Sequence, residues 1–284
     1  MAKTLKDWSE LEISDNFIFQ KVMRNSALCK ELLEGILGIR IRRLTFPETE
    51  KQIEIYYRSK GIRLDVYVED ERGVIYNIEM QTTGAAETDE LLRRMRYYQA
   101  SIDMAILDRG KPYKDLPRTY IIFICTFDMF GCGRSKYTFR HTATEDPALV
   151  ADDGTTRIVL SAKGAGDDVS PDVARLLRYI DGAPAEGAFV EAIAAEVEKI
   201  KNKEEMRGEY MVYSAEMQRT KSEGYLEGIE YGKVEGKVEG RDEERVSSLR
   251  NLILKAGWTL EKAMEMLGIP LSERDKYAAH LQNA

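Results

Sequence analysis

RLDVYVEDERGVIYNIEMQ, residues 63–81, predicts two β-strands joined by a tight turn. Apolar side chains alternate with other side chains on both sides of the turn, which is the period of a strand. Asp65 takes one face of the first strand, and Glu79 and Gln81 share one face of the second. If a turn at residues 70–73 closes the hairpin, Asp65 lies opposite Glu79, with Cβ atoms roughly 4.5 to 5.5 Å apart.

Two carboxylates directly opposite each other destabilise a sheet unless a cation lies between them. A divalent metal supplies that charge, and hard oxygen ligands suit Mg²⁺ or Mn²⁺. The alternative is a hairpin whose charged side chains simply face water, as most do at alternating strand positions. Gln81 favours the metal, because it returns to the face of Glu79, where its amide can orient a water or contact a phosphate oxygen.

The sequence around this hairpin predicts helices on both sides of it. Ser14-Asp15 opens one helical pattern, a second one ends at Gly38, and a third extends from about Glu87 to Leu107. Residues 53–58 predict a further strand.

A buried central strand is predicted over residues 119–127, TYIIFICTF, because nearly every residue there is apolar, β-branched or aromatic. Residues 137–143 and 156–162 predict another hairpin, and residues 170–205 a helical region. The order of helix, strands, helix and strand fits an α/β fold class, with a mixed β-sheet flanked by helices.

Composition excludes several classes of function. The chain has 284 residues, 43% of them hydrophobic, and should form a globular core. Its three cysteines lack paired spacing and its two histidines are too few for Ser-His-Asp or HExxH chemistry. A formal charge of −7 does not fit a bulk nucleic-acid binder. No run of about 18 apolar residues occurs, so we expect no membrane partner and a cytoplasmic protein.

A glycine repeats at every fourth residue near the C-terminus. The glycines are Gly224, Gly228, Gly232, Gly236 and Gly240. Four residues advance a helix by about 400°, so these glycines form a slowly winding stripe that lets two helices approach closely. One interpretation is a stalk that makes a homo-oligomer. The other is a weak, partly frayed helical linker, since each Gly costs roughly 0.8 to 1 kcal/mol relative to Ala.

The chain is therefore expected to have three segments. Residues 1–205 form the core, residues 206–245 the glycine-repeat linker or stalk, and residues 246–284 a small module of amphipathic helices.

Several stretches in this order resemble the Rpn family of recombination-promoting nucleases, which are also described as transposases, within the PD-(D/E)XK nuclease superfamily. The similarity covers about residues 8–200, and the C-terminal tail also looks like that of its relatives. The stretches are SDNFIFQKVM with Asp15, RLDVYV with Asp65, YNIEMQ with Glu79, RYYQASID at 96–103 and YIIFICTFDMFG at 120–131.

This resemblance implies a restriction-endonuclease-like core and metal-dependent cleavage of DNA phosphodiesters. By position, Asp65 matches the motif's central aspartate, Glu79 its second acid, and Gln81 the position usually held by lysine. Asp15 is similar to the acid on the family's first helix, although an N-terminal helix charge favoured by the macrodipole explains it equally well. Gln81 departs from the pattern, because an amide lacks the positive charge of a lysine.

The implied chemistry has physical requirements that these residues meet. Phosphodiester hydrolysis requires hydroxide near pH 7 and neutralisation of a phosphate that gains charge in the transition state. Mg²⁺ held by Asp65 and Glu79 supplies both, and the backbone carbonyl of Met80 is the expected third ligand. All three are candidate metal ligands, and Gln81 and Asp15 complete the candidate catalytic set.

Basic residues could contact the DNA backbone. Arg94 is the strongest candidate, since helical spacing places it away from the apolar residues of its helix. Arg134 and Lys136, near the loop FGCGRSK, are weaker candidates because basic loops are common.

The expected function is a Mg²⁺-dependent DNA endonuclease that promotes recombination or acts in mobile-element biology or phage defence. The alternative is a catalytically weak or inactive DNA-binding or interaction module that retains the nuclease fold. A DNA-joining transposase would need strand transfer, and no residue pattern indicates it.

Overall fold

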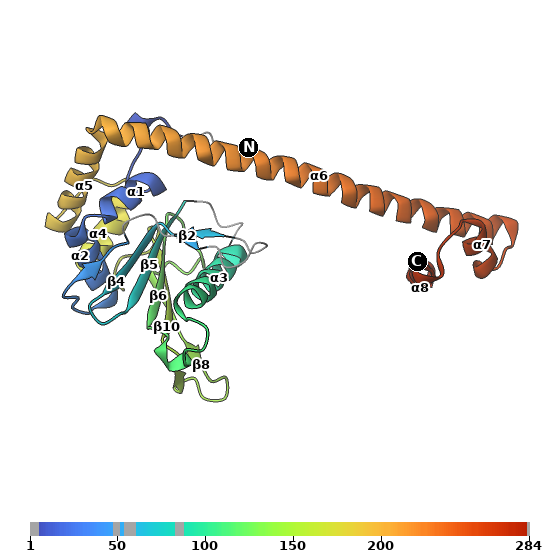
Figure 1. Cartoon of the computed structure of the whole chain (residues 1–284), viewed down its shortest axis with the longest axis horizontal. Coiled ribbons are helices and arrows are strands. Elements are labelled where there is room, and N and C mark those ends of the chain that lie inside the picture. The colour runs from blue at the N-terminus through green and yellow to red at the C-terminus, as the bar shows by residue number, and fades with distance from the viewer. Residues whose placement is uncertain (1–5, 48–51, 54–60, 83–87, 283–284) are drawn as a thin grey trace. The chain divides into compact units, whose positions relative to one another are not determined.

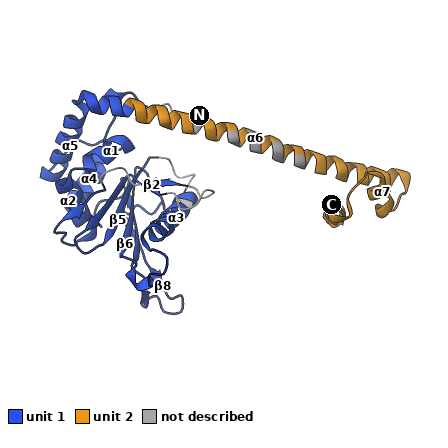
Figure 2. Cartoon of the chain, in the orientation of Figure 1, with its two compact units in different colours: residues 1–210 blue, residues 211–284 orange. Residues whose placement is uncertain are grey.

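The computed structural model describes residues 6–47, 52–53, 61–82 and 88–282 of the chain. The chain has two compact units, Met1–Tyr210 and Met211–Ala284 (Figure 2). The three-segment division expected from the sequence, with boundaries at residues 205 and 245, stays a prediction.

A six-stranded sheet forms the centre of the first unit (Figure 1). Its strands are β1 (Leu44–Thr45), β4 (Val66–Asp70), β5 (Ile75–Gln81), β6 (Thr119–Cys125), β7 (Lys136–Phe139) and β10 (Thr155–Ser161). They lie in the order β1-β4-β5-β6-β10-β7. The pairs β5/β6 and β6/β10 are parallel, and the outer pairs are antiparallel. The expected α/β class with a mixed sheet is therefore confirmed.

Helices cover both faces of this sheet. They are α1 (Asn16–Met23), α2 (Ser26–Leu37), α3 (Thr88–Ile106), α4 (Pro171–Ile180) and α5 (Ala188–Lys201). Helices α1, α2, α4 and α5 pack against one another on one face, and α1 also contacts β5. Helix α3 lies on the other face, where it contacts β6 (Figure 1).

Short elements complete the first unit. They are the 3₁₀ turns η1 (Trp8–Glu10) and η3 (Tyr113–Asp115), the pair β2 (Gln52–Ile53) with β3 (Ile62–Arg63), and the pair β8 (His141–Thr142) with β9 (Val150–Ala151). Of the strand expected over residues 53–58, residues 54–58 lie outside the described residues.

Apart from the strand over residues 53–58, the helices and strands predicted from periodicity are present. Helix α2 ends at Gly38, which takes the left-handed conformation (φ 66°) that a C-cap glycine adopts without strain. Strand β6 is buried at six of its seven positions, as its continuous apolar sequence predicted. The second predicted hairpin is the antiparallel pair β7 and β10, with the β8/β9 pair inserted between its strands in the chain.

Strand β5 is buried along its whole length, yet only one of its faces is apolar. Tyr76, Ile78 and Met80 are almost completely buried on one face. Glu79 and Gln81 lie on the opposite face, which α3 covers. The sheet thus places the polar side chains of Asn77, Glu79 and Gln81 in an interior layer, with Glu79 and Gln81 at the end of a central strand.

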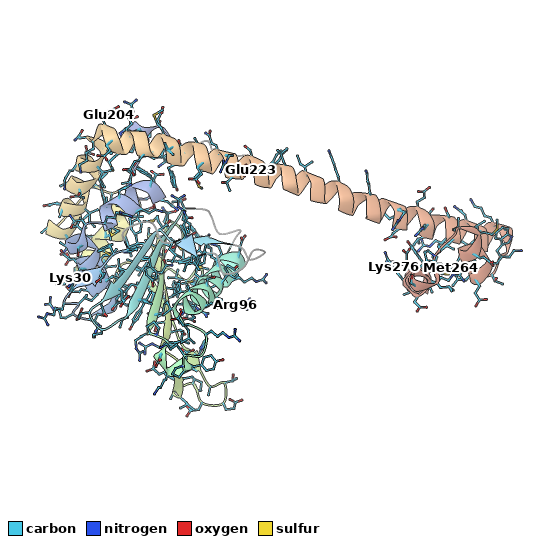
Figure 3. The ribbon with its side chains drawn as sticks, in the orientation of Figure 1. Lys30, Arg96, Glu204, Glu223, Met264 and Lys276 are labelled. Carbon is cyan, nitrogen blue, oxygen red and sulfur yellow. The ribbon has the colours of Figure 1, made fainter. Side chains whose placement is uncertain are left out.

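The described residues of the second unit form helices, a 3₁₀ turn and their connections. Helix α6 (Glu204–Ala256) contains the whole glycine repeat, and Glu223, just before the repeat, lies along its middle part (Figure 3). It is followed by α7 (Leu260–Met266), the 3₁₀ turn η4 (Leu271–Glu273) and α8 (Arg274–Gln282). A small core closes this end of the unit and comprises Leu249, Ala263, Met264, Ile269 and Tyr277. The expected helical C-terminal extension is confirmed.

No helix in the described part of the chain is long and apolar enough to cross a membrane.

Candidate metal centre

The β4–β5 hairpin brings Asp65 and Glu79 together. Strand pairing matches Val66 with Ile78, so the next position outward sets Asp65 opposite Glu79. The backbone N–H of Asp65 donates a hydrogen bond to Oε1 of Glu79 at 3.1 Å. Gly73 closes the turn with φ 76° and donates its N–H to the carbonyl of Asp70, which fixes this register.

The carboxylate of Asp65 is oriented from two sides. Its Oδ1 accepts a hydrogen bond of 2.8 Å from Nε2 of Gln20, a residue of helix α1. Its Oδ2 accepts one of 3.1 Å from the backbone N–H of Met80 on β5. The carboxylate is therefore fixed between the first helix and the strand that carries Glu79.

Glu79 is a buried acid with a perturbed pKa. Only 2% of the residue is exposed. Burial, followed by the negative charge of Asp65, holds the pKa of Glu79 well above its usual range. The backbone N–H of Asp65 and the positive charge of Arg94 act in the opposite direction without cancelling this effect. Burial and the neighbouring acid therefore both disfavour the charged form of Glu79.

Gln81 and Arg94 lie beside this pair and contact each other. Nη1 of Arg94 donates a hydrogen bond of 3.0 Å to Oε1 of Gln81. Nη2 of Arg94 donates one of 3.2 Å to the hydroxyl of Tyr98, one turn further along α3. A cation thus reaches the site from α3, although position 81 itself carries none.

Asp15 has contacts of its own at the start of α1. Its Oδ2 accepts hydrogen bonds from Nζ of Lys6 at 2.9 Å and from the backbone N–H of Glu12 at 2.8 Å. The α1 side chain that contacts Asp65 is Gln20. Asp15 precedes the first residue of the helix, as a favourable N-terminal charge would, and its catalytic role stays a prediction.

Lys136 is not brought to the carboxylate pair. Strand β7 lies three strand positions from β5, which corresponds to roughly 14 Å. Pairing aligns Lys136 with Leu160, Ile124 and Met80, so its side chain shares the face of Met80 and not that of Glu79. Its ammonium donates to the carbonyl of Ile36 on α2, and burial lowers its pKa.

Arg134 lies next to β7 and is paired with an acid. Its Nε lies 3.4 Å from Oδ2 of Asp168. The same carboxylate accepts hydrogen bonds from the backbone N–H groups of Ser135 and Lys136. A contact of Arg134 or Lys136 with DNA stays a prediction, and neither residue is part of the carboxylate site.

The sequence analysis missed two residues of the site. Gln20 is a polar residue between the apolar residues of α1, and this interruption of the apolar pattern was the available signal. Tyr98 is a buried aromatic residue of α3. Its spacing of four residues from Arg94 could have indicated the pair, because such residues are neighbours on a helix surface.

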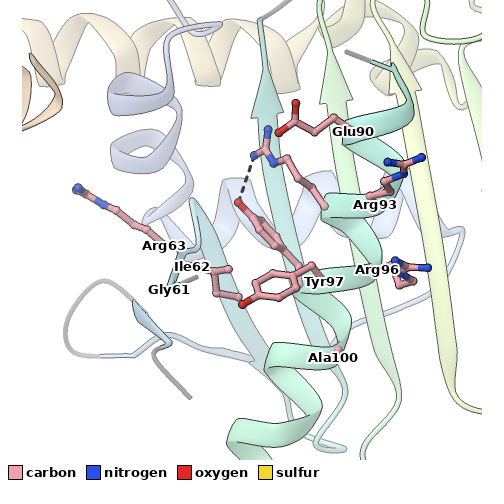
Figure 4. Close-up of a pocket in the computed structure, with 10 residues that line it drawn as sticks. Gly61, Ile62, Arg63, Glu90, Arg93, Arg96, Tyr97 and Ala100 are labelled. Carbon is pink, nitrogen blue, oxygen red and sulfur yellow. Dashed lines mark hydrogen bonds between the residues drawn. The ribbon is translucent and has the colours of Figure 1, made fainter. Parts of the chain in front are cut away.

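A cavity of about 610 Å³ adjoins the site (Figure 4). Its walls include Arg94 and Tyr98 together with Arg63, Arg93 and Arg96. This arginine-rich wall suits a polyanionic ligand.

The donor set fits a hard divalent cation. Asp65 and Glu79 lie opposite each other, and each carboxylate accepts a backbone hydrogen bond from the other strand. A divalent ion bound between them would favour the charged form of Glu79, which burial and Asp65 disfavour. Within the described ranges no group of three or more His, Cys, Asp or Glu side chains gathers to hold a metal. Two carboxylates are sufficient for Mg²⁺, which binds proteins through one or two carboxylates and keeps several waters. The carbonyl of Met80 as a third ligand stays a prediction.

Comparison with known proteins gives one finding. Residues 16–145 match the family model described as PD-(D/E)XK nuclease family transposase. No curated protein and no solved structure matches the chain. The matched segment contains both carboxylates, Gln20, Gln81 and Arg94, and extends from α1 through the β4–β5 hairpin, α3 and β6 to β8.

Proposed function

We propose that the chain is a Mg²⁺- or Mn²⁺-dependent DNA endonuclease, because residues 16–145 match the model of the PD-(D/E)XK nuclease family transposases and contain a restriction-endonuclease-like sheet. Asp65 and Glu79 hold the ion, and the substrate is the phosphodiester backbone of DNA. The observation that carries the proposal is the buried Glu79 carboxylate facing Asp65 with a pKa well above its usual range. Such pairs cluster at sites that bind metals or perform catalysis.

The residues of this chain have separate roles in the proposed reaction. Asp65 and Glu79 supply oxygen ligands, and Gln20 with the N–H of Met80 keeps the Asp65 carboxylate in one orientation. A bound Mg²⁺ supplies Lewis-acid polarisation of the phosphate and a water of lowered pKa. Burial of Glu79 excludes bulk water from one side, which strengthens each charge interaction in the site.

Cleavage of supercoiled plasmid tests this proposal. The wild type should nick or linearise plasmid with Mg²⁺ or Mn²⁺ and not with EDTA, and Glu79→Ala should lose the activity. Glu69→Ala is the matched control, because Glu69 is an exposed acid on the same hairpin. An intact wild type without metal-stimulated cleavage contradicts the enzyme and supports an inactive module that retains the fold.

We further propose that the glycine repeat of α6 mediates a homo-oligomer. Exposed apolar side chains occur along the helix on either side of the first glycine, including Met211, Val212, Tyr225 and Leu226. A Cβ added at Gly224 or Gly228 meets no atom within 4 Å, so substitution there does not disturb the described protomer. The variant Gly224→Lys, Gly228→Lys should therefore block close helix approach and reduce the mass measured by light scattering. An unchanged mass removes this role.

The biological setting follows from the family resemblance alone. We propose that the cleavage promotes recombination, or serves mobile elements or phage defence.

A further inference from the structure

Arg94 is held in place by two buried acceptors. Gln81 is 5% exposed and Tyr98 is 9% exposed, and each accepts one hydrogen bond from the guanidinium. Figure 4 shows the hydrogen bond to Tyr98 as a dashed line. The rings of Tyr98 and Phe123 lie under the guanidinium carbon, with centroids 5.6 and 5.7 Å away. These contacts fix the plane of the group before any ligand arrives.

The guanidinium retains unused donors. An arginine has five N–H groups in a rigid fork. Two of them donate to Gln81 and Tyr98, so three lack a partner among the described residues. Donors that are fixed in orientation and still available are what a phosphate oxygen requires.

Arg94 belongs to both the carboxylate site and the adjoining cavity. It contacts Gln81, two residues beyond Glu79, and its charge interacts with those of Glu79 and Asp65. It also lines the 610 Å³ cavity, as do Arg63, Arg93 and Arg96. Figure 4 shows Arg63 on one side of α3 and Arg93 and Arg96 on the other. A DNA strand lying in that cavity therefore meets Arg94 next to the metal ligands.

We propose that Arg94 is the catalytic cation of this nuclease and that Gln81 is the residue that positions it. This inference rests on the proposed function and deepens it. Arg94 donates its remaining N–H groups to a non-bridging oxygen of the scissile phosphate and stabilises the charge that develops there. It neither gives nor takes a proton, because a guanidinium stays protonated. The amide of Gln81 thus holds a cation that is supplied by α3, whereas a lysine at position 81 would supply the cation from β5 itself.

Kinetics of the full chain test the assignment. With saturating plasmid and Mg²⁺, Arg94→Ala should lower the rate constant of cleavage roughly 100-fold. Arg94→Lys should retain part of the rate, since it keeps the charge and loses the fork. Millimolar methylguanidinium should restore part of the activity of Arg94→Ala. Gln81→Ala should lose activity to a smaller extent. It should not respond to methylguanidinium, because Arg94 is still present in this variant but is no longer held in position.

A control and a folding check accompany these variants. Arg109→Ala removes an exposed arginine beyond the end of α3 and should cleave like the wild type. Thermal melts by circular dichroism must show folded protein, and Arg94→Gln replaces Arg94→Ala if the alanine variant melts below the assay temperature. Cleavage by Arg94→Ala within about twofold of the wild type overturns the inference while leaving the nuclease itself intact.

Binding in EDTA separates the inference from the proposed function. Fluorescence anisotropy with a 12-base-pair DNA duplex should show binding about tenfold weaker for Arg94→Ala than for Arg109→Ala, since one held phosphate contact is lost. If the wild type does not cleave, the proposed function fails, and this affinity difference still supports a phosphate-binding Arg94. Equal affinities for the two variants overturn the phosphate contact.

Discussion

The two ends of the β4–β5 hairpin each bury a carboxylate, and the two carboxylates have opposite surroundings. Asp70 at the turn end is 3% exposed, and Glu79 at the open end is 2% exposed. Asp70 accepts hydrogen bonds from the side chain and N–H of Arg72, from the N–H of Val74 and from the hydroxyl of Tyr76. Glu79 faces Asp65, a second acid.

The pKa values follow these surroundings. Burial alone would raise the pKa of Asp70, but the hydrogen bonds and charge of Arg72 and the neighbouring donors hold it below its usual range. Burial and Asp65 raise the pKa of Glu79. Both ends of the hairpin therefore bury an acid, and what distinguishes the candidate metal site is the second acid beside Glu79.

The largest expected effect concerns cleavage at the open end. Asp65→Asn removes one of the two charged ligands and should reduce single-turnover cleavage of plasmid roughly 1000-fold. Asp70→Asn, measured per folded molecule at low temperature, should cleave within a few-fold of the wild type. Equal losses for the two variants would contradict the distinction between the two ends.

The second effect concerns stability at the turn end. Asp70→Asn replaces a carboxylate that accepts several hydrogen bonds and should lower the free energy of unfolding by about 2 to 3 kcal/mol. Since the folded pKa of Asp70 is lowered, its contribution is present above the ordinary Asp value and is lost as the pH falls through the folded pKa. Urea unfolding of the wild type and of Asp70→Asn across pH 3 to 7 measures this contribution. A difference in free energy of unfolding that stays constant across that range would contradict the lowered pKa of Asp70.

The smallest expected effect is a gain in the free energy of unfolding, opposite in sign to the loss expected for Asp70→Asn. Glu79→Gln removes a carboxyl group whose folded pKa is raised, so the contribution of Glu79 is present below the ordinary Glu value and is lost as the pH rises. Without metal at pH 7, the variant should be more stable than the wild type by about 1 kcal/mol. The gain should shrink toward pH 4. Urea unfolding in EDTA measures it, and a variant less stable than the wild type at pH 7 would show that Glu79 stabilises the fold.

The hairpin and its register could be predicted from the sequence because their signals are local. Alternation over residues 63–81 and a turn that ends in Gly73 together determine which residues face each other. The apolar run of β6 likewise predicts a central strand without reference to the rest of the chain. The alternation and the turn are enough to place Asp65 opposite Glu79.

Other parts of the site depend on contacts that no local pattern encodes. Gln20 reaches Asp65 across 45 positions of sequence because α1 packs against β5. Lys136 turns to the opposite face because β7 pairs with β10 in one particular register, and a shift of one residue would have reversed it. Arg94 was chosen as a phosphate contact from helical spacing, but its attachment to Gln81 required the packing of α3 on the sheet.

Binding of Mn²⁺ to the full chain tests the central claim most directly, because it does not depend on cleavage. Isothermal titration calorimetry should show Mn²⁺ binding by the wild type and by Glu69→Gln, and at least about tenfold weaker binding by both Asp65→Asn and Glu79→Gln. Mn²⁺ that binds Glu79→Gln as tightly as the wild type, or no binding by the wild type, would contradict a divalent ion held by the Asp65–Glu79 pair.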